Sequence, residues 1–142
     1  MRPQQNYRRV QIATADPTQI VVMLYEGAIS NLNQTQRLLG TDDAKALERV
    51  ARTQEIINYL RSVLDHQRGG EISANLERLY EYMRDKLNET LIQRTPAPVG
   101  EVIHLLGILL EAWRGVAQQS AEPEPADEPA AAPPQRSFSF MG

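Results

Sequence analysis

Apolar residues recur at three- and four-residue steps along four stretches of the chain, which is the spacing of a helix that buries one face. The first stretch begins at Asp16, a good N-cap, followed by Pro17, which suits the first helical position, and it ends at Gly40. Glycines and prolines also separate the later stretches. The pattern predicts four helices and no convincing strand, over about residues 16–40, 41–70, 71–94 and 99–119.

Each predicted helix has an apolar face that points into a shared core, and the fourth helix is the most apolar. Helices of about 20–25 residues with short connections favour antiparallel neighbours. We therefore expect residues 16–120 to form an all-α, antiparallel up-down four-helix bundle. Residues 1–15 are expected to be an extended N-terminal arm, and residues 121–142, rich in Pro, Ala and Glu, a disordered tail. The predicted core residues of the first three helices are Val21, Leu24, Ala28, Leu32, Thr35 and Leu39; Ala46, Val50, Thr53, Ile57, Leu60 and Leu64; and Ile72, Leu76, Leu79, Met83 and Leu87.

The composition removes several classes of function. With no cysteine and two histidines, the chain has no disulfide, no thiol catalysis and no histidine-rich metal site. Its longest apolar stretch, Val102 to Leu110, is far shorter than the ~20 residues of a membrane span, and no signal-peptide pattern is present. We therefore expect a cytoplasmic protein without direct membrane insertion. The net charge of −3 equals that of the tail alone, which has four acids and one arginine, so residues 1–120 are neutral and lack the basic face of a nucleic-acid binder.

Two histidine-based sites can be considered. Glu101-x-x-His104 has the spacing of bundle di-iron sites, but such a site needs the motif twice, and Val63 stands three residues before His66. A phosphotransfer bundle would need cations near an exposed histidine, and no basic residue lies within helical reach of His104. No Ser/His/Asp set or phosphate-binding glycine loop can be argued. We expect no enzyme and no cofactor or metal, and a phosphotransfer bundle using His104 remains the alternative.

Apolar residues outside the predicted core faces are the most informative feature. On the second helix they are spaced i, i+3, i+7 and point ~80–140° away from the core. On the fourth helix, Ile108 lies inside a polar arc of ~140° around His104, and Ile103 and Leu110 lie beside the edge of that arc. They predict a groove for a partner's amphipathic helix, which the arm covers when no client is bound; alternatively they only flank a wide core face. The predicted partner-binding residues are Tyr7, Val10 and Ile12 in the arm, Ile56, Tyr59 and Val63 on the second helix, and Ile103, Ile108 and Leu110 on the fourth.

Four groups of motifs, in order along about residues 7–118, together resemble the flagellar secretion chaperone (FliS) family. They are Tyr7, Ile12-Ala13-Thr14-Ala15-Asp16-Pro17 and Met23-Leu24-Tyr25-Glu26-Gly27-Ala28; Gln54-Glu55-Ile56-Ile57 through Leu64-Asp65; Gly69-Gly70-Glu71-Ile72, Asn75-Leu76 and Leu79-Tyr80-Glu81-Tyr82-Met83; and Glu111-Ala112-Trp113.

This resemblance implies a helical bundle that binds the disordered C-terminal segment of newly made flagellin in the cytoplasm. The chaperone would prevent premature polymerisation and present its client to the membrane export gate of the flagellar type III system, without nucleotide or metal. Tyr7 and Ile12 match the arm that resembles a movable cap in the family. We expect a monomer or weak homodimer, and a generic helical adaptor for another client stays open.

Two features depart from the family pattern. The family usually has a short acidic linker where this chain has Thr95-Pro96-Ala97-Pro98. The tail also extends beyond the family core and carries Phe138 and Phe140, which form either a short docking motif or an unstructured end.

Overall fold

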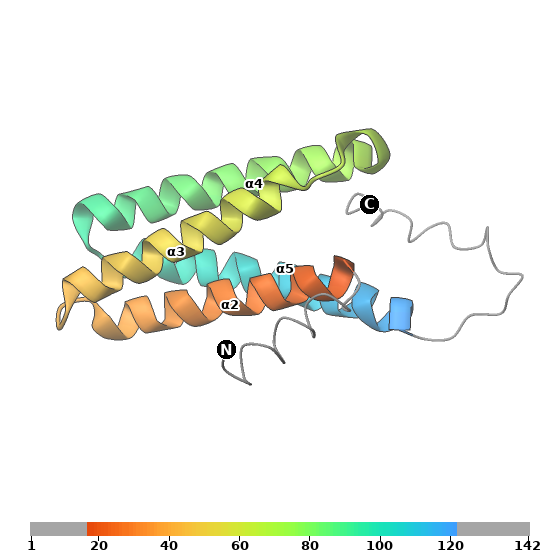
Figure 1. Ribbon diagram of the computed structural model, residues 1–142. Helices are drawn as coiled ribbons and strands as arrows, with labels where there is room; N and C mark the ends of the chain where they lie inside the picture. Colours follow the sequence, from red (N-terminus) through yellow and green to blue (C-terminus); the bar gives the residue numbers. More distant parts are fainter. Residues whose placement is uncertain (1–16, 122–142) are drawn as a thin grey trace, which may run out of the picture.

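The computed structural model describes residues 17–121, which form an antiparallel bundle of four helices without a strand (Figure 1). Helix α2 packs beside α3 and α5, and α4 packs beside the same two helices on the opposite side of the bundle. This arrangement confirms the predicted fold class. The predicted arm and nearly all of the predicted tail lie outside the described residues. The helices are α2 (Pro17–Leu38), α3 (Asp43–Ser62), α4 (His66–Gln93) and α5 (Ala97–Ala121).

The connection from α2 to α3 follows the signals in the sequence. Gly40 has a φ of +88°, a left-handed conformation that glycine adopts without strain. Asp42 is the N-cap of α3, since its side chain accepts a hydrogen bond from the Lys45 backbone N–H. The Asp43 carboxylate accepts another from the Gly40 N–H at 2.7 Å. The predicted helix end at Gly40 is therefore confirmed to within two residues.

The boundary between α3 and α4 differs from the prediction, which carried the second helix through to Gly69-Gly70. Helix α3 ends at Ser62, and Asp65 starts α4 by accepting hydrogen bonds from the backbone N–H groups of Gln67 and Arg68. Gly70, with φ +51° and ψ −122°, then kinks α4 one turn after its start. The glycine does interrupt a helix, but it lies inside the next one.

The core follows the predicted faces on α3 and differs at aromatic positions on α2 and α4. The predicted core residues Leu24 and Leu79 are only partly buried. Their neighbours in the chain, Tyr25 and Tyr80, are fully buried instead. A tyrosine can be buried when its hydroxyl finds a partner. Here the two hydroxyls meet each other at 2.6 Å, linking α2 and α4 across the diagonal of the bundle.

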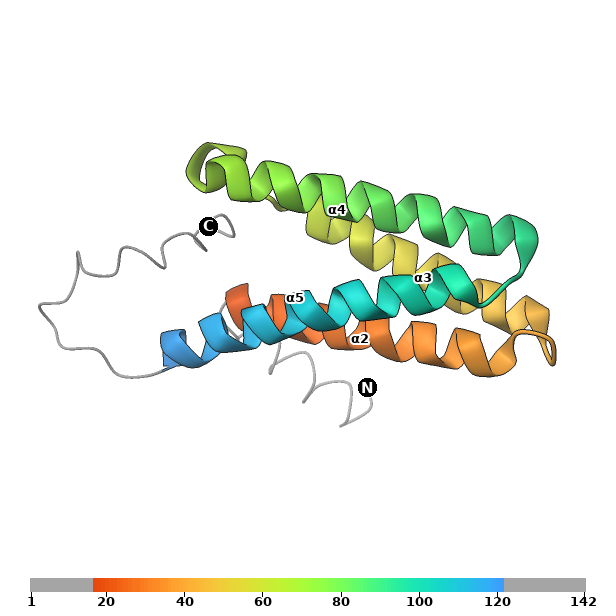
Figure 2. The same cartoon turned by 180° about the vertical axis from the view of Figure 1, so that it is seen from behind.

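The bundle is not uniform along its length. The closed end, where α2 connects to α3 and α4 to α5, brings the helices close together. At the splayed end, where α3 connects to α4, the α3–α4 pair diverges from the α2–α5 pair in both views (Figure 2). Leu76 and Trp113, toward the splayed end, and Leu110, near the middle of α5, keep a small exposed fraction, whereas the core at the closed end is fully enclosed.

Candidate partner-binding surface

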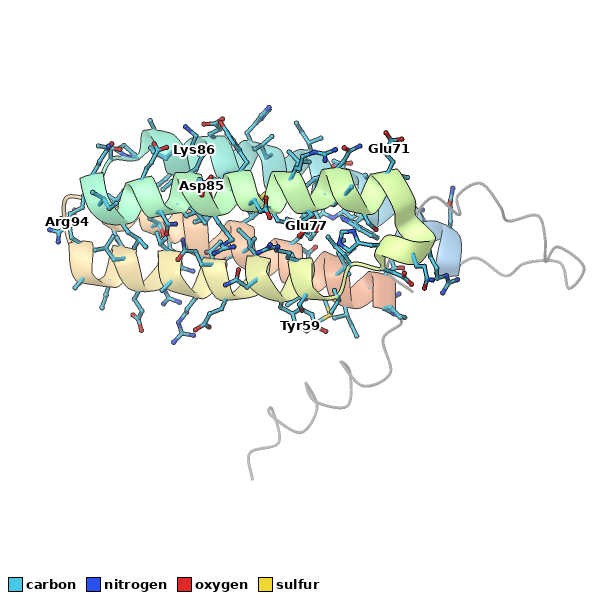
Figure 3. The ribbon with its side chains drawn as sticks, turned by 90° about the horizontal axis from the view of Figure 1, so that it is seen from above. Tyr59, Glu71, Glu77, Asp85, Lys86 and Arg94 are labelled. Carbon is cyan, nitrogen blue, oxygen red and sulfur yellow. The ribbon has the colours of Figure 1, made fainter. Side chains whose placement is uncertain are left out.

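The residues predicted on the second helix form an apolar row on α3, which we call the α3 stripe: Ile56, Tyr59 and Val63. Tyr59 is 51% exposed, and Figure 3 shows it on the side of α3 that faces away from α4. Ile56 and Val63 are half-buried. A Cβ built on Gly27 would lie 3.9 Å from Ile56 Cδ1, so the stripe begins against α2. The stripe therefore lies on the α2 side of α3, along the junction of the two helices, which we call the α2–α3 groove.

The first half of α2 supplies the opposite wall of this groove, which sequence reasoning missed. Ile20, Leu24 and Gly27 follow the i, i+4, i+7 spacing, which places them on one side of the helix. Leu24 packs against the core, and Ile20 is half-buried. Gly27 has no side chain to fill the space facing Ile56. The spacing was visible in the sequence, but Leu24 was assigned to the core instead.

The residues predicted on the fourth helix do not form one surface. Ile108 is 56% exposed, Ile103 is half-buried against the core, and Leu110 is only 6% exposed. The expectation that Leu110 lies on the surface was wrong. Leu110 shares a helix face with the buried Leu106, four residues earlier, and therefore points inward. Only Ile108 presents a large exposed apolar side chain.

The groove between α2 and α5 is shallow and mostly polar. Arg114 of α5 bonds the Glu26 carboxylate of α2 at 2.9 Å across it. On the same side of α5, a Cβ built on Gly100 would lie 3.3 Å from Gln36 Nε2. Beside α3, the α2 surface carries the apolar contact of Ile56 with Gly27 and, further along, the polar contact of Arg49 with Asn31 at 3.5 Å. The α2–α5 groove is lined by Glu26, Ile29, Ser30, Asn33, Arg37, Leu110 and Arg114.

Charged groups fix α4 against α3 beside the turn that joins them. The Arg61 guanidinium contacts Glu77 at 3.3 Å and Glu81 at 2.9 Å, and His66 Nε2 lies 3.1 Å from a Glu77 oxygen. Glu77 lies between the two helices in Figure 3. Because these groups are half-exposed, the pairs contribute modestly to stability. They do set the position of α3, and with it that of the stripe.

The histidine-based sites gain no support from the geometry. Glu101 accepts a hydrogen bond from the Tyr82 hydroxyl of α4, and Lys86 lies 3.8 Å from its other oxygen. This carboxylate raises the pKa of the Tyr82 hydroxyl by holding its proton. His104 is exposed. Within residues 17–121, no group of three or more metal-ligating side chains is close enough to hold an ion.

The remaining predicted binding residues, Tyr7, Val10 and Ile12, lie outside the described part of the chain. Among residues 17–121, no helix combines the length and apolar character needed to cross a membrane.

Comparison with known proteins decides the family. The family described as "Flagellar protein FliS" matches residues 1–120, which include the whole bundle. This chain belongs to the FliS family. The suspected resemblance is confirmed, and with it the assignment to a family of flagellar secretion chaperones.

Curated relatives agree with this assignment. The flagellar secretion chaperone FliS of Salmonella typhimurium is 33% identical over 112 residues, covering 78% of this chain and 83% of the relative. FliSB of Pseudomonas aeruginosa is 30% identical over 122 residues, covering 82% of this chain and 96% of the relative. FliS of Bacillus subtilis is 26% identical over 117 residues, covering 82% and 86%. The FliS family match stops at residue 120, so it does not include the tail.

Proposed function

We propose that this FliS-family protein is a cytoplasmic export chaperone, not an enzyme, that binds the disordered C-terminal segment of flagellin. Binding would prevent premature polymerisation and hold the client ready for the membrane export gate of the flagellar type III system. The observation that supports the proposal is the α3 stripe, an apolar row in which Tyr59 is exposed and Ile56 and Val63 are half-buried beside α2.

The shape of this groove suits a helical client. An amphipathic helix docks through anchors at i, i+3, i+4 and i+7, and the α3 stripe repeats at the same steps. Tyr59 offers a large side chain with little rotamer entropy to lose, which is typical of residues that dominate binding energy. A disordered segment that folds on binding loses ordering entropy, which lowers its net affinity and favours later release.

The central experiment is a calorimetric titration with two flagellins, one complete and one lacking its last ~40 residues, a length sufficient for a helix-in-groove contact. We expect binding only with the complete protein. Binding of neither flagellin would point to a generic adaptor with another client, and equal binding of both would show that the C-terminal segment is not what the protein binds. Labelled phosphate transferred to His104 from a phosphorylated response regulator would favour the phosphotransfer alternative instead.

A matched pair of variants locates the binding surface. Tyr59→Glu places a charge in the stripe, and we expect it to weaken client binding by ~10-fold or more. Ile92→Glu is the control, because Ile92 is 80% exposed on α4, away from the stripe. Both positions are exposed, so both variants should fold. If the two variants bind equally well, the client does not use the α3 stripe. The double variant Ile56→Glu with Val63→Glu extends the test to the half-buried members of the row.

The N-terminal arm is proposed to cover the groove until the client arrives. Deleting residues 1–12 removes Tyr7, Val10 and Ile12 and should therefore speed client association in stopped-flow measurements, since a covered site reduces the fraction of competent protein. Identical association rates with and without the arm would show that it does not act as a cap.

A further inference from the structure

A second exposed apolar site lies on α5, outside the α2–α3 groove. Ile108 projects into solvent and has a carboxylate three residues later, Glu111, whose side chain is 80% exposed. Seven residues before Ile108 lies Glu101, which is bonded to the 39% exposed Tyr82 of α4. At 100° per residue, Glu111, Ile108 and Glu101 fall within an arc of about 80° on the outer side of α5. We call these three residues and Tyr82 the outer α5 strip.

The chain continues for 21 residues beyond α5, past the residues matched by the family. That segment holds an acidic, proline-rich stretch followed by Arg136, Phe138 and Phe140. In an extended segment alternate residues share one face and lie ~6.8 Å apart. Arg136, Phe138 and Phe140 would therefore form a row of one cation and two aromatic rings about 13 Å long.

The order of these groups matches the outer α5 strip. A segment that leaves α5 at Ala121 and returns along it runs antiparallel to the helix, so its later residues meet earlier helix positions. Arg136 then meets Glu111, Phe138 meets Ile108, and Phe140 approaches Tyr82. Glu111 and Glu101 are ten residues apart on the helix, which is about 15 Å along its axis and close to the length of the row.

The intervening tether has a suitable length. Glu111 lies ten residues before Ala121, again about 15 Å along the axis. The 14 residues 122–135 can span up to ~46 Å when extended, which exceeds the ~15 Å needed to return to Glu111.

We propose that residues 136–140 of the tail dock on the outer α5 strip of their own molecule, with the two phenylalanines covering Ile108 and Tyr82. The row pairs the one tail arginine with the most exposed carboxylate of the strip. The strip lies apart from the α3 stripe, so docking there keeps the tail's aromatic residues away from the proposed client groove. This proposal does not depend on the identity of the client.

Paramagnetic relaxation on the full chain tests the proposal. Because the chain has no cysteine, Ser137→Cys provides a single site for a nitroxide label, on the face of the segment opposite to Phe138. We expect the isoleucine methyl signal of Ile108 to be broadened several-fold more than that of Ile92. Substituting Phe138→Ser with Phe140→Ser should abolish the difference, and Glu111→Lys should reduce it. The tail substitutions lie outside the bundle and leave its core unchanged.

Three results would overturn the proposal. Broadening of Ile108 that is the same with and without the Phe138→Ser and Phe140→Ser substitutions would show an undocked tail, because a label tethered at Ala121 broadens nearby methyl groups without docking. Strongest broadening at Ile56 would show that the tail occupies the α2–α3 groove instead. Broadening of Ile108 that appears only on an unlabelled copy mixed with labelled protein would show docking between molecules rather than within one.

Discussion

The hydrogen bond between Tyr25 and Tyr80 gives a sharp test of how the core is held together. Both rings are fully buried, and the hydroxyls are 2.6 Å apart. Replacing one tyrosine by phenylalanine leaves the other hydroxyl buried without this partner, which costs about 1–3 kcal/mol of unfolding free energy. Replacing both removes the two polar groups together, so the double variant should lose less stability than the sum of the two single variants. Trp113 also hydrogen-bonds Tyr25, so Tyr25→Phe should cost more than Tyr80→Phe.

The same pair predicts how stability depends on alkaline pH. Burial raises the pKa of Tyr25 to about 12, partly offset by its hydrogen bonds to Tyr80 and Trp113, and burial also raises the pKa of Tyr80. Above pH 10 the unfolded tyrosines release their protons while the folded ones keep them, so rising pH favours the unfolded state. The stability that Tyr25 contributes through its raised pKa is fully present below pH 10 and is lost as the pH rises toward 12.

Urea unfolding followed by circular dichroism at pH 7, 10 and 11.5 measures both effects. The double phenylalanine variant should lose stability less steeply than the parent protein above pH 10, and it controls for the titration of lysines shared by both. Two outcomes would refute the reasoning. One is strict additivity of the single variants at pH 7, and the other is the same pH slope in the parent and in the double variant.

Other predictions concern single positions. Trp113→Ala removes a buried core side chain and should lower the free energy of unfolding, measured in urea, by ~3–5 kcal/mol. A small decrease would contradict the burial of Trp113. Gly70→Ala should destabilise by ~1–3 kcal/mol because φ is +51°, although a Cβ there would meet no atom within 4 Å. A Cβ at Gly107, inside α5, would also meet no atom within 4 Å, and Gly107→Ala should instead stabilise the protein by ~0.5–1 kcal/mol. Equal effects of the two substitutions would show that the backbone of Gly70 is not strained by a side chain. Asp65→Ala removes the N-cap of α4 and should cost ~1 kcal/mol, and thermal unfolding unchanged by it would disprove that role.

The number and order of the helices could be predicted because each helix repeats apolar residues on one face and most ends carry a recognisable cap. The turn between α3 and α4 escaped prediction because Val63 and Leu64 continue the apolar spacing of α3 through the turn itself. The residue that marks the start of α4 is Asp65, whose carboxylate accepts hydrogen bonds from two backbone N–H groups of the first turn. A glycine pair nearby is a stronger signal in sequence, and it drew the predicted boundary to the wrong place.

Exposed apolar residues could be predicted only where the helical period places them far from the buried face of their helix. Tyr59 and Ile108 lie far from the buried direction of their helices and are exposed. Leu110 lies near the edge of the buried arc, where a helical wheel cannot tell which side faces a neighbouring helix. That distinction depends on which helices pack beside α5, and the pattern of a single helix does not contain it. Tyr25 and Tyr80 were missed for a similar reason, because only their contact across the bundle makes their burial favourable.

The divergence of the helices follows from the sizes of the residues in the core. At the closed end the layers hold small or β-branched residues such as Ala46, Thr53 and Val99, which let helices approach closely. Toward the splayed end the layers hold Tyr25, Tyr80 and Trp113, whose rings keep helices further apart. Helix α3 diverges from α2 as it approaches the splayed end (Figure 1), and Tyr59, in its last turn, is 51% exposed. We therefore expect a smaller residue at these core positions to bring α3 closer to α2 and to narrow the surface that the client is proposed to use.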